Sequence, residues 1–150
     1  MSSFFYIGGG AMSYEEKGTL VYLVVSALTY LGYVVVVLGR AGDGPVAAVP
    51  YVSPMLWSIG IAVGLAVVGR VVLEAAKPSE SHRADARDRD IDRFGEHVAG
   101  VVLGVGMVLP FALTLAQAPH FWIANAIFLV FNAWAVFGAT VKLVAYRRGF

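Results

Sequence analysis

Two charged side chains near the end of a long apolar run are the first candidates for chemistry. Arg70 and Glu74 are four residues apart, so they share one face of a helix and can form an ion pair. Ionisable groups inside a membrane often mark a functional site, but Arg70 is close enough to the end of the run to extend its guanidinium towards the lipid headgroups. We interpret the pair first as a structural anchor and keep a transport role for both residues as the alternative.

Four aspartates lie within a strongly charged segment, residues 77–97, where metal binding is the chemistry to consider. Its aspartates offer oxygen ligands, but the segment lacks the turn glycine and the closing glutamate of an EF-hand loop. Arginines alternate with the acids, a pattern typical of a solvated, salt-bridged helix surface. We therefore predict no metal site and take six charged residues as candidates for binding a protein partner: Arg83, Arg87, Asp88, Arg89, Asp92 and Arg93.

Other reactive centres are not indicated by the sequence. The chain contains no cysteine, which excludes disulfides, thiolate metal sites and a cysteine nucleophile. His97 and His120 would lie at opposite ends of one predicted span, about 30 Å apart, so they cannot hold one haem iron within a monomer. No catalytic Ser-His-Asp or paired-carboxylate set can be assembled inside the membrane. We expect no cofactor and no enzymatic activity.

Four long apolar runs must position these residues. The 150-residue chain is 59% hydrophobic and only 14% charged, which is too apolar for an ordinary soluble domain. Each run has the length of about 20 residues that crosses a hydrocarbon core. The runs predict transmembrane helices at residues 18–39, 51–76, 98–118 and 121–145.

The predicted fold class is all-α, with the four helices arranged as two antiparallel hairpins in a single transmembrane domain, residues 18–146. Residues 1–17 and 147–150 form the terminal segments. Ile91, Phe94 and Val98 continue an apolar stripe at helical spacing from the charged segment into the third run. Residues 77–97 are therefore predicted to be a helical arm that extends the third helix.

Small and polar residues within the runs predict helix packing. Two pairs of glycines are spaced four apart, a pattern that lets helix backbones approach closely in membranes: Gly60 with Gly64, and Gly100 with Gly104. Asn125 and Asn132 share one face of the fourth run, and we expect them to face protein. Pro110 should kink the third run because it removes a backbone hydrogen bond.

The chain resembles a family of small four-helix membrane proteins of bacteria and archaea whose function is uncharacterised. Four stretches carry the resemblance: Met12-Ser-Tyr-Glu-Glu-Lys17, Asp85-Ala-Arg-Asp-Arg-Asp-Ile91, Phe121-Trp-Ile-Ala-Asn125 and the ending Tyr146-Arg-Arg-Gly149. The resemblance covers residues 12–150, which makes Met12 an alternative translation start. It implies a four-helix integral membrane fold, often encoded beside a small DNA-binding regulator, and supplies no site residues.

These observations lead to the expectation of a non-enzymatic membrane protein that acts through helix association, as a homo-oligomer or with other membrane subunits. The alternative is a small dimeric transporter similar to the four-helix multidrug exporters, although the first run holds no acid. Residues 77–93 contain five basic and five acidic side chains, so no nucleic-acid or polybasic lipid patch is predicted. The bilayer is the one partner that composition alone implies.

The distribution of basic residues predicts the orientation in the cell (inner) membrane. Nine lysines and arginines fall on the side that holds both termini and the charged segment, and only Arg40 falls on the other. By the positive-inside rule both termini are cytoplasmic. A reporter that is active only in the cytoplasm, fused after Phe150, should be active, whereas activity of a periplasm-specific reporter at that position would contradict this topology.

Overall fold

Long helices dominate the computed structural model, which describes residues 12–76 and 86–148. The helices are α1 (Tyr14–Ala41), α2 (Val52–Ala75), α3 (Ala86–Gly106), α4 (Val108–Leu115) and α5 (His120–Arg148), with a short 3-10 helix, η1 (Val46–Ala48), after α1. α3 and α4 together form one span, so the described residues contain four helices long and apolar enough to cross a membrane. The predicted all-α fold is confirmed.

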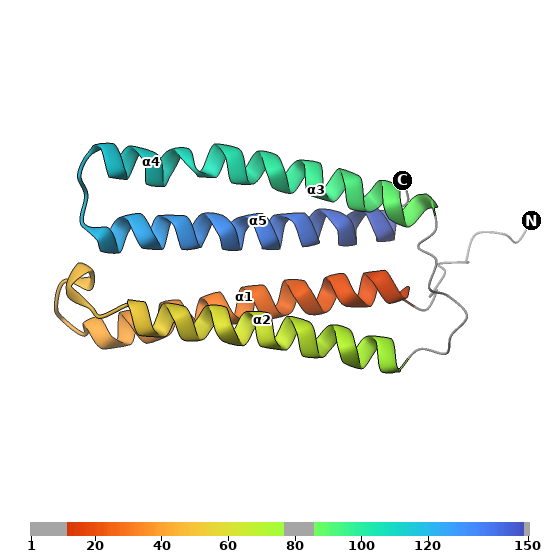
Figure 1. The fold of residues 1–150 in the computed structure, drawn as a ribbon, viewed down its shortest axis with the longest axis horizontal. Coiled ribbons are helices and arrows are strands. Elements are labelled where there is room, and N and C mark those ends of the chain that lie inside the picture. Colours follow the sequence, from red (N-terminus) through yellow and green to blue (C-terminus); the bar gives the residue numbers. More distant parts are fainter. Residues whose placement is uncertain (1–11, 77–85, 149–150) are drawn as a thin grey trace, which may run out of the picture.

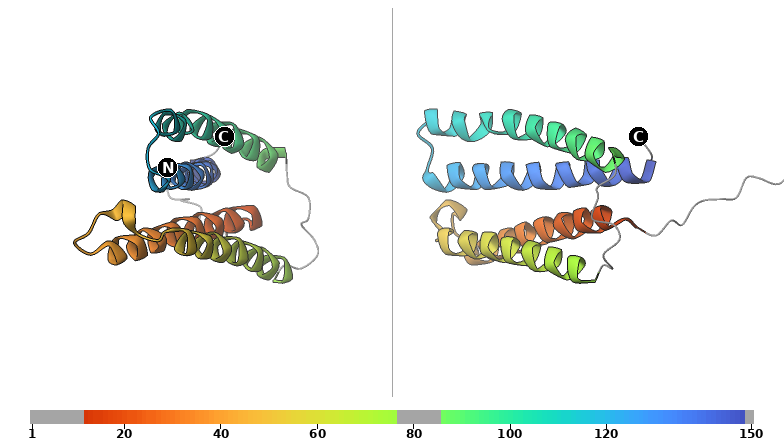
Figure 2. Two further views of the ribbon diagram at one scale, coloured as in Figure 1. Left: turned by 60° about the vertical axis from the view of Figure 1, so that its left-hand side comes forward. Right: turned by 45° about the vertical axis from the view of Figure 1, so that its right-hand side comes forward.

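The helices form two antiparallel hairpins that lie against each other (Figure 1). α1 pairs with α2, and α5 pairs with α3 and α4, while α1 and α5 pack together and join the hairpins. The helices thus form a row in the order α2, α1, α5, α3. Figure 2 shows this row from two further directions, with α1 and α5 in the middle and α2 and α3 on the outside. We call the end that holds the start of α1, the end of α2, the start of α3 and the end of α5 the charged end.

Local sequence explains where α1 begins and ends. The backbone N–H of Glu16 donates to the Ser13 side chain at 3.1 Å, so Ser13 caps the helix, and Glu15 and Glu16 place negative charge in its first turn. α1 ends at Ala41, and the next residue, Gly42, has a φ of 51°, a positive value that glycine adopts easily. The connection from Gly42 to Tyr51, which includes η1, then leads to α2.

The third span is interrupted near Pro110, as the sequence predicts. Pro110 lies in the first turn of α4, and the break between α3 and α4 falls at Met107, one turn earlier. Because proline has no N–H, the Gly106 carbonyl loses its usual helical partner four residues on. Val130 packs so closely on Gly106 that a Cβ atom there would overlap its side chain.

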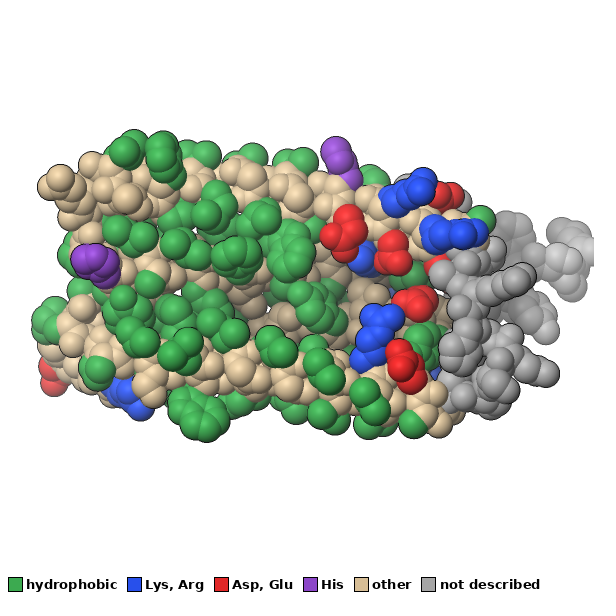
Figure 3. Space-filling view, in the orientation of Figure 1, with side chains coloured by type: hydrophobic (Ala, Val, Ile, Leu, Met, Phe, Trp, Pro, Cys, Tyr) green, Lys and Arg blue, Asp and Glu red, His purple; other side chains and the backbone are tan. Residues whose placement is uncertain are grey.

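The helical extension of the third span is confirmed for residues 86–97, since α3 begins at Ala86 and continues into the apolar run. Ile91 is fully buried within this part. Arg83, Asp85 and the rest of residues 77–85 lie outside the described residues. Lysine, arginine and acidic side chains gather at the charged end, whereas the middle of the molecule is hydrophobic (Figure 3).

An aromatic cluster fastens the two hairpins at the end opposite the charged end. Tyr33, Val37, Val49 and Phe121 are buried together. The rings of Tyr33 and Phe128 meet edge to face at 5.1 Å between centroids, and the Tyr33 hydroxyl donates to Asn125 Oδ1 at 2.7 Å. This bond crosses from α1 to α5.

The two predicted asparagines differ in role. The expectation that the Asn125 side chain faces protein is confirmed, because it bonds to Tyr33 and donates to the Phe121 carbonyl at 2.8 Å. Asn132 is half-buried, and no hydrogen bond of its side chain is recorded within residues 12–76 and 86–148. A second polar link that the sequence did not indicate joins α2 to α1, where the buried Ser58 hydroxyl donates to the Thr29 carbonyl at 2.8 Å.

The Tyr33–Asn125 bond should contribute measurably to stability. Replacing Tyr33 by Phe removes only the hydroxyl, and we expect a loss of about 0.5–1.5 kcal/mol in unfolding free energy. Tyr30→Phe is the matched control, because Tyr30 lies in the same cluster but has no recorded hydrogen bond in the described chain. Thermal unfolding of both variants in detergent checks this, and equal effects of the two would contradict it.

Candidate functional site

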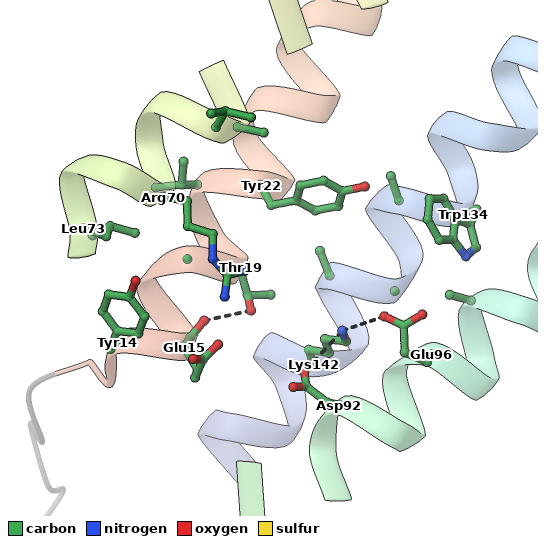
Figure 4. A pocket seen from close by; sticks show the side chains of 18 residues that line it. Tyr14, Glu15, Thr19, Tyr22, Arg70, Leu73, Asp92, Glu96, Trp134 and Lys142 are labelled. Carbon is green, nitrogen blue, oxygen red and sulfur yellow. Dashed lines mark hydrogen bonds and ion pairs between the residues drawn. The ribbon is translucent and has the colours of Figure 1, made fainter. Parts of the chain in front are cut away.

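A cavity with charged and aromatic residues in its walls lies between the two hairpins at the charged end. Its volume is about 580 Å³, and α1, α2, α3 and α5 all contribute to its walls. Figure 4 shows Tyr22 pointing from α1 towards α5, on which Trp134 lies. The polar and aromatic residues that line it are Tyr14, Glu15, Thr19, Tyr22, Arg70, Asp92, Glu96, Trp134 and Lys142.

Small side chains explain why a cavity forms here. Between the charged and aromatic groups, its walls carry residues too small to fill the space between helices, namely Gly18, Ala66, Ala99, Ala135, Gly138 and Ala139. Trp134 and Lys142 both line the cavity and are eight residues apart on α5, so the cavity extends about 12 Å along the axis of this helix. The cavity therefore reaches from the charged end well into the apolar part of the helices.

Lys142 holds α5 to α3 at one wall of the cavity. Its Nζ lies 3.2 Å from Asp92 Oδ1 and 2.9 Å from Glu96 Oε1, and its side chain is only 18% exposed. The stem of Lys142 lies directly on Gly95, where a Cβ atom would overlap the Cγ and Cε atoms of the lysine. One turn further along, Gly138 packs against the Cβ of Ala99.

The opposite wall carries the Arg70–Glu74 pair predicted from the sequence. Arg70 Nε lies 3.4 Å from Glu74 Oε1, which confirms the pairing, and both side chains are more than half exposed. Arg70 lines the cavity, whereas Glu74 is not among the lining residues. An exposed pair of this kind stabilises a fold by about 1 kcal/mol at most.

Glu15 differs from the other carboxylates of the cavity. It is half-buried, and within residues 12–76 and 86–148 no cation is recorded against its side chain. Its neighbour Glu16 turns to α5, where it lies 3.8 Å from Arg147. The cavity wall on α1 therefore carries one carboxylate that no described basic residue neutralises.

The predicted partner-binding residues divide between two faces of α3. Asp92 faces α5 through its ion pair with Lys142, and Arg87 donates to the Tyr146 carbonyl of α5 at 3.4 Å. Asp88 is half-buried, while Arg89 and Arg93 are exposed on the outer face. Of the five candidates within the described residues, Arg87, Arg89 and Arg93 are all exposed, and only Arg89 and Arg93 have no recorded contact with α5; Arg83 lies outside the described residues.

The predicted packing glycines lie on open surface within a single chain. A Cβ atom at any of four positions would meet nothing within 4 Å, which places these residues away from the neighbouring helices of the same chain: Gly60, Gly64, Gly100 and Gly104. The close approaches inside the chain occur instead at Gly69, Gly95, Gly106 and Gly138. Spacing of four residues correctly showed which glycines share a helix face. It did not show which glycines contact another helix of the described chain.

Sequence reasoning also missed Lys142 and Gly95 as site residues. One signal was present, because Lys142 lies inside the predicted fourth span, where a buried cation needs an acidic partner. Asp92 and Glu96 are four apart on the antiparallel neighbour, so both can reach one lysine. The described residues contain no group of three histidines, cysteines or acids arranged to hold a metal ion.

We find no significant match to this chain among protein-family models, curated proteins or solved structures. The resemblance to small four-helix membrane proteins accordingly remains a prediction.

The contact between Gly95 and Lys142 can be tested by adding a methyl group. We expect Gly95→Ala to lower the unfolding free energy by about 1–2 kcal/mol, because the lysine stem must move and its ion pairs lengthen. In a Lys142→Ala background the stem is absent, so the same substitution should cost little. Thermal unfolding in detergent of both single variants and the double variant measures this coupling.

Gly100→Ala is the matched control on the same helix, since a Cβ atom there meets open space. It should be neutral or slightly stabilising, because alanine is the better helix former. Equal costs at Gly95 and Gly100 would contradict the proposed contact.

Proposed function

We propose that this protein is a non-enzymatic integral membrane protein that acts by lateral association of its helices, in the first place with a second copy of itself. The observation that supports the proposal is the exposed glycine face of α2. Only 6% of the most apolar window of α2 is buried inside the chain, against 22% for α5. Outside the stripe that packs on α1, most of α2 is therefore open to lipid or to another helix.

Gly60 and Gly64 favour another helix over lipid. A pair of glycines four apart creates a shallow groove that lets a second backbone approach closely, which strengthens van der Waals contact between helices in a bilayer. Because a Cβ atom at either glycine would meet no atom of the described part of the chain within 4 Å, the groove is available to a partner. Two copies related by a two-fold axis would place the same groove against itself, which is the commonest arrangement of homodimers.

Cross-linking in native membranes tests this proposal. The chain has no cysteine, so a single introduced cysteine reports unambiguously. Val71 lies seven residues beyond Gly64 and hence on the same face of α2, and Val71→Cys should form disulfide-linked dimers on mild oxidation. Val72→Cys is the matched control, because Val72 is equally exposed (58% against 57%) but is rotated by about 100° around the helix.

Substitution of the glycines completes the experiment. Gly60→Leu with Gly64→Leu should reduce cross-linking of Val71→Cys at least severalfold, because the larger side chains keep the helices apart. Gly32→Leu is the control, since Gly32 is also open to its surroundings but lies on α1. Equal cross-linking at the two cysteine positions, or cross-linking that survives the double leucine change, would contradict association through α2.

A further inference from the structure

The charges around the cavity leave an excess of negative charge. Glu15, Asp92 and Glu96 line it against Arg70 and Lys142. Lys142 is already held between Asp92 and Glu96, and Arg70 is paired with Glu74. Once these pairs are formed, both basic groups are occupied and the Glu15 carboxylate remains without a described cation. A cavity of this kind disfavours anions and attracts a single positive charge.

The aromatic residues of the walls favour the same charge. Tyr14 and Tyr22 come from α1 and Trp134 from α5, so aromatic rings line two sides of the space. Aromatic rings attract cations through their quadrupole, and organic ammonium ions are commonly recognised in this way. The small apolar residues between the rings suit hydrocarbon groups attached to the cation.

The size and position of the cavity fit a small organic molecule. Its volume of about 580 Å³ lies within the range of about 300–1,000 Å³ typical of small-molecule sites. It lies between the two hairpins and extends from the charged end, so a cation bound there would be near the end of the helices. An inorganic cation would leave most of the space and all of the aromatic surface unused.

We propose that this cavity binds an organic monocation with apolar substituents, with its charge near Glu15 and its apolar groups between Tyr22 and Trp134. The site lies within one chain and does not depend on association through α2. Asp92 and Glu96 hold Lys142 in place and contribute negative charge at the opposite wall.

Binding of tetraphenylphosphonium to purified full-length protein in detergent tests this proposal. Trp134 is one of three tryptophans, so Trp57→Phe with Trp122→Phe leaves it as the sole reporter at the cavity wall. We expect saturable quenching of its fluorescence by tetraphenylphosphonium. Tetraphenylborate has the same shape and the opposite charge, and it should produce no saturable quenching.

Two carboxamide variants locate the charge that is recognised. Glu15→Gln should weaken binding of tetraphenylphosphonium by about fivefold to tenfold, since it removes the unneutralised carboxylate. Asp90→Asn changes the net charge equally, but Asp90 is exposed and does not line the cavity, so its affinity should match that of the parent protein. Both variants keep the polar shape of the side chain, and their elution and thermal unfolding confirm that they are folded.

Three outcomes would overturn the proposal. They are the absence of saturable tetraphenylphosphonium binding to folded protein, equal binding of tetraphenylborate, and equal affinities of the Glu15→Gln and Asp90→Asn variants. The second outcome would show hydrophobic partition alone, and the third would show attraction to the overall surface charge. Each result is independent of whether Val71→Cys forms cross-links.

Discussion

Inside a bilayer, apolar side chains gain little by leaving lipid for each other, so helices that span it need specific contacts to stay together. This chain meets that constraint with a polar contact at each interface of its row of helices. Ser58 joins α2 to α1, Tyr33 and Asn125 join α1 to α5, and Lys142 joins α5 to α3. The rest of the arrangement depends on these three links, since little of each helix is buried.

The two ends of the molecule are built differently around these links. At the end opposite the charges, the Tyr33 bond lies within an aromatic cluster whose rings fill the space between hairpins. At the charged end several of the residues between the hairpins are glycine and alanine, and the two hairpins leave a polar cavity between them. The lysine that closes one wall can lie flat on α3 only because position 95 has no side chain. Packing and the candidate site thus share the same small residues.

An open row of helices also leaves much apolar surface on the outer members. α2 has α1 as its principal neighbour, and its glycine pair is not used inside the chain. In water such a surface would be a liability, but in a bilayer it is compatible with lipid and with another helix alike. The proposed association and the proposed ligand binding accordingly use different surfaces, one facing outward from α2 and one between the hairpins.

Several features could be read from the residues before any tertiary arrangement was known. Long apolar runs determine four spans, because a backbone in hydrocarbon must satisfy its own hydrogen bonds. The same local rules predicted the break near Pro110, the helical part of the arm and the Arg70–Glu74 pair. All of these depend on neighbours within a few positions along the chain, so composition and spacing are sufficient.

Which residues meet at the candidate site was decided by the tertiary structure. The periodicity of the sequence shows which residues share a helix face, but it does not show which face contacts which helix. Glycine is also equally suited to a close helix contact and to an open surface. Gly95 and Gly60 illustrate this, because only the first touches another helix of the chain. Lys142 and Asp92 are 50 positions apart, and what brings them together is the rotation and register of α5 on α3. That register follows from the shapes of all the side chains at the interface taken together.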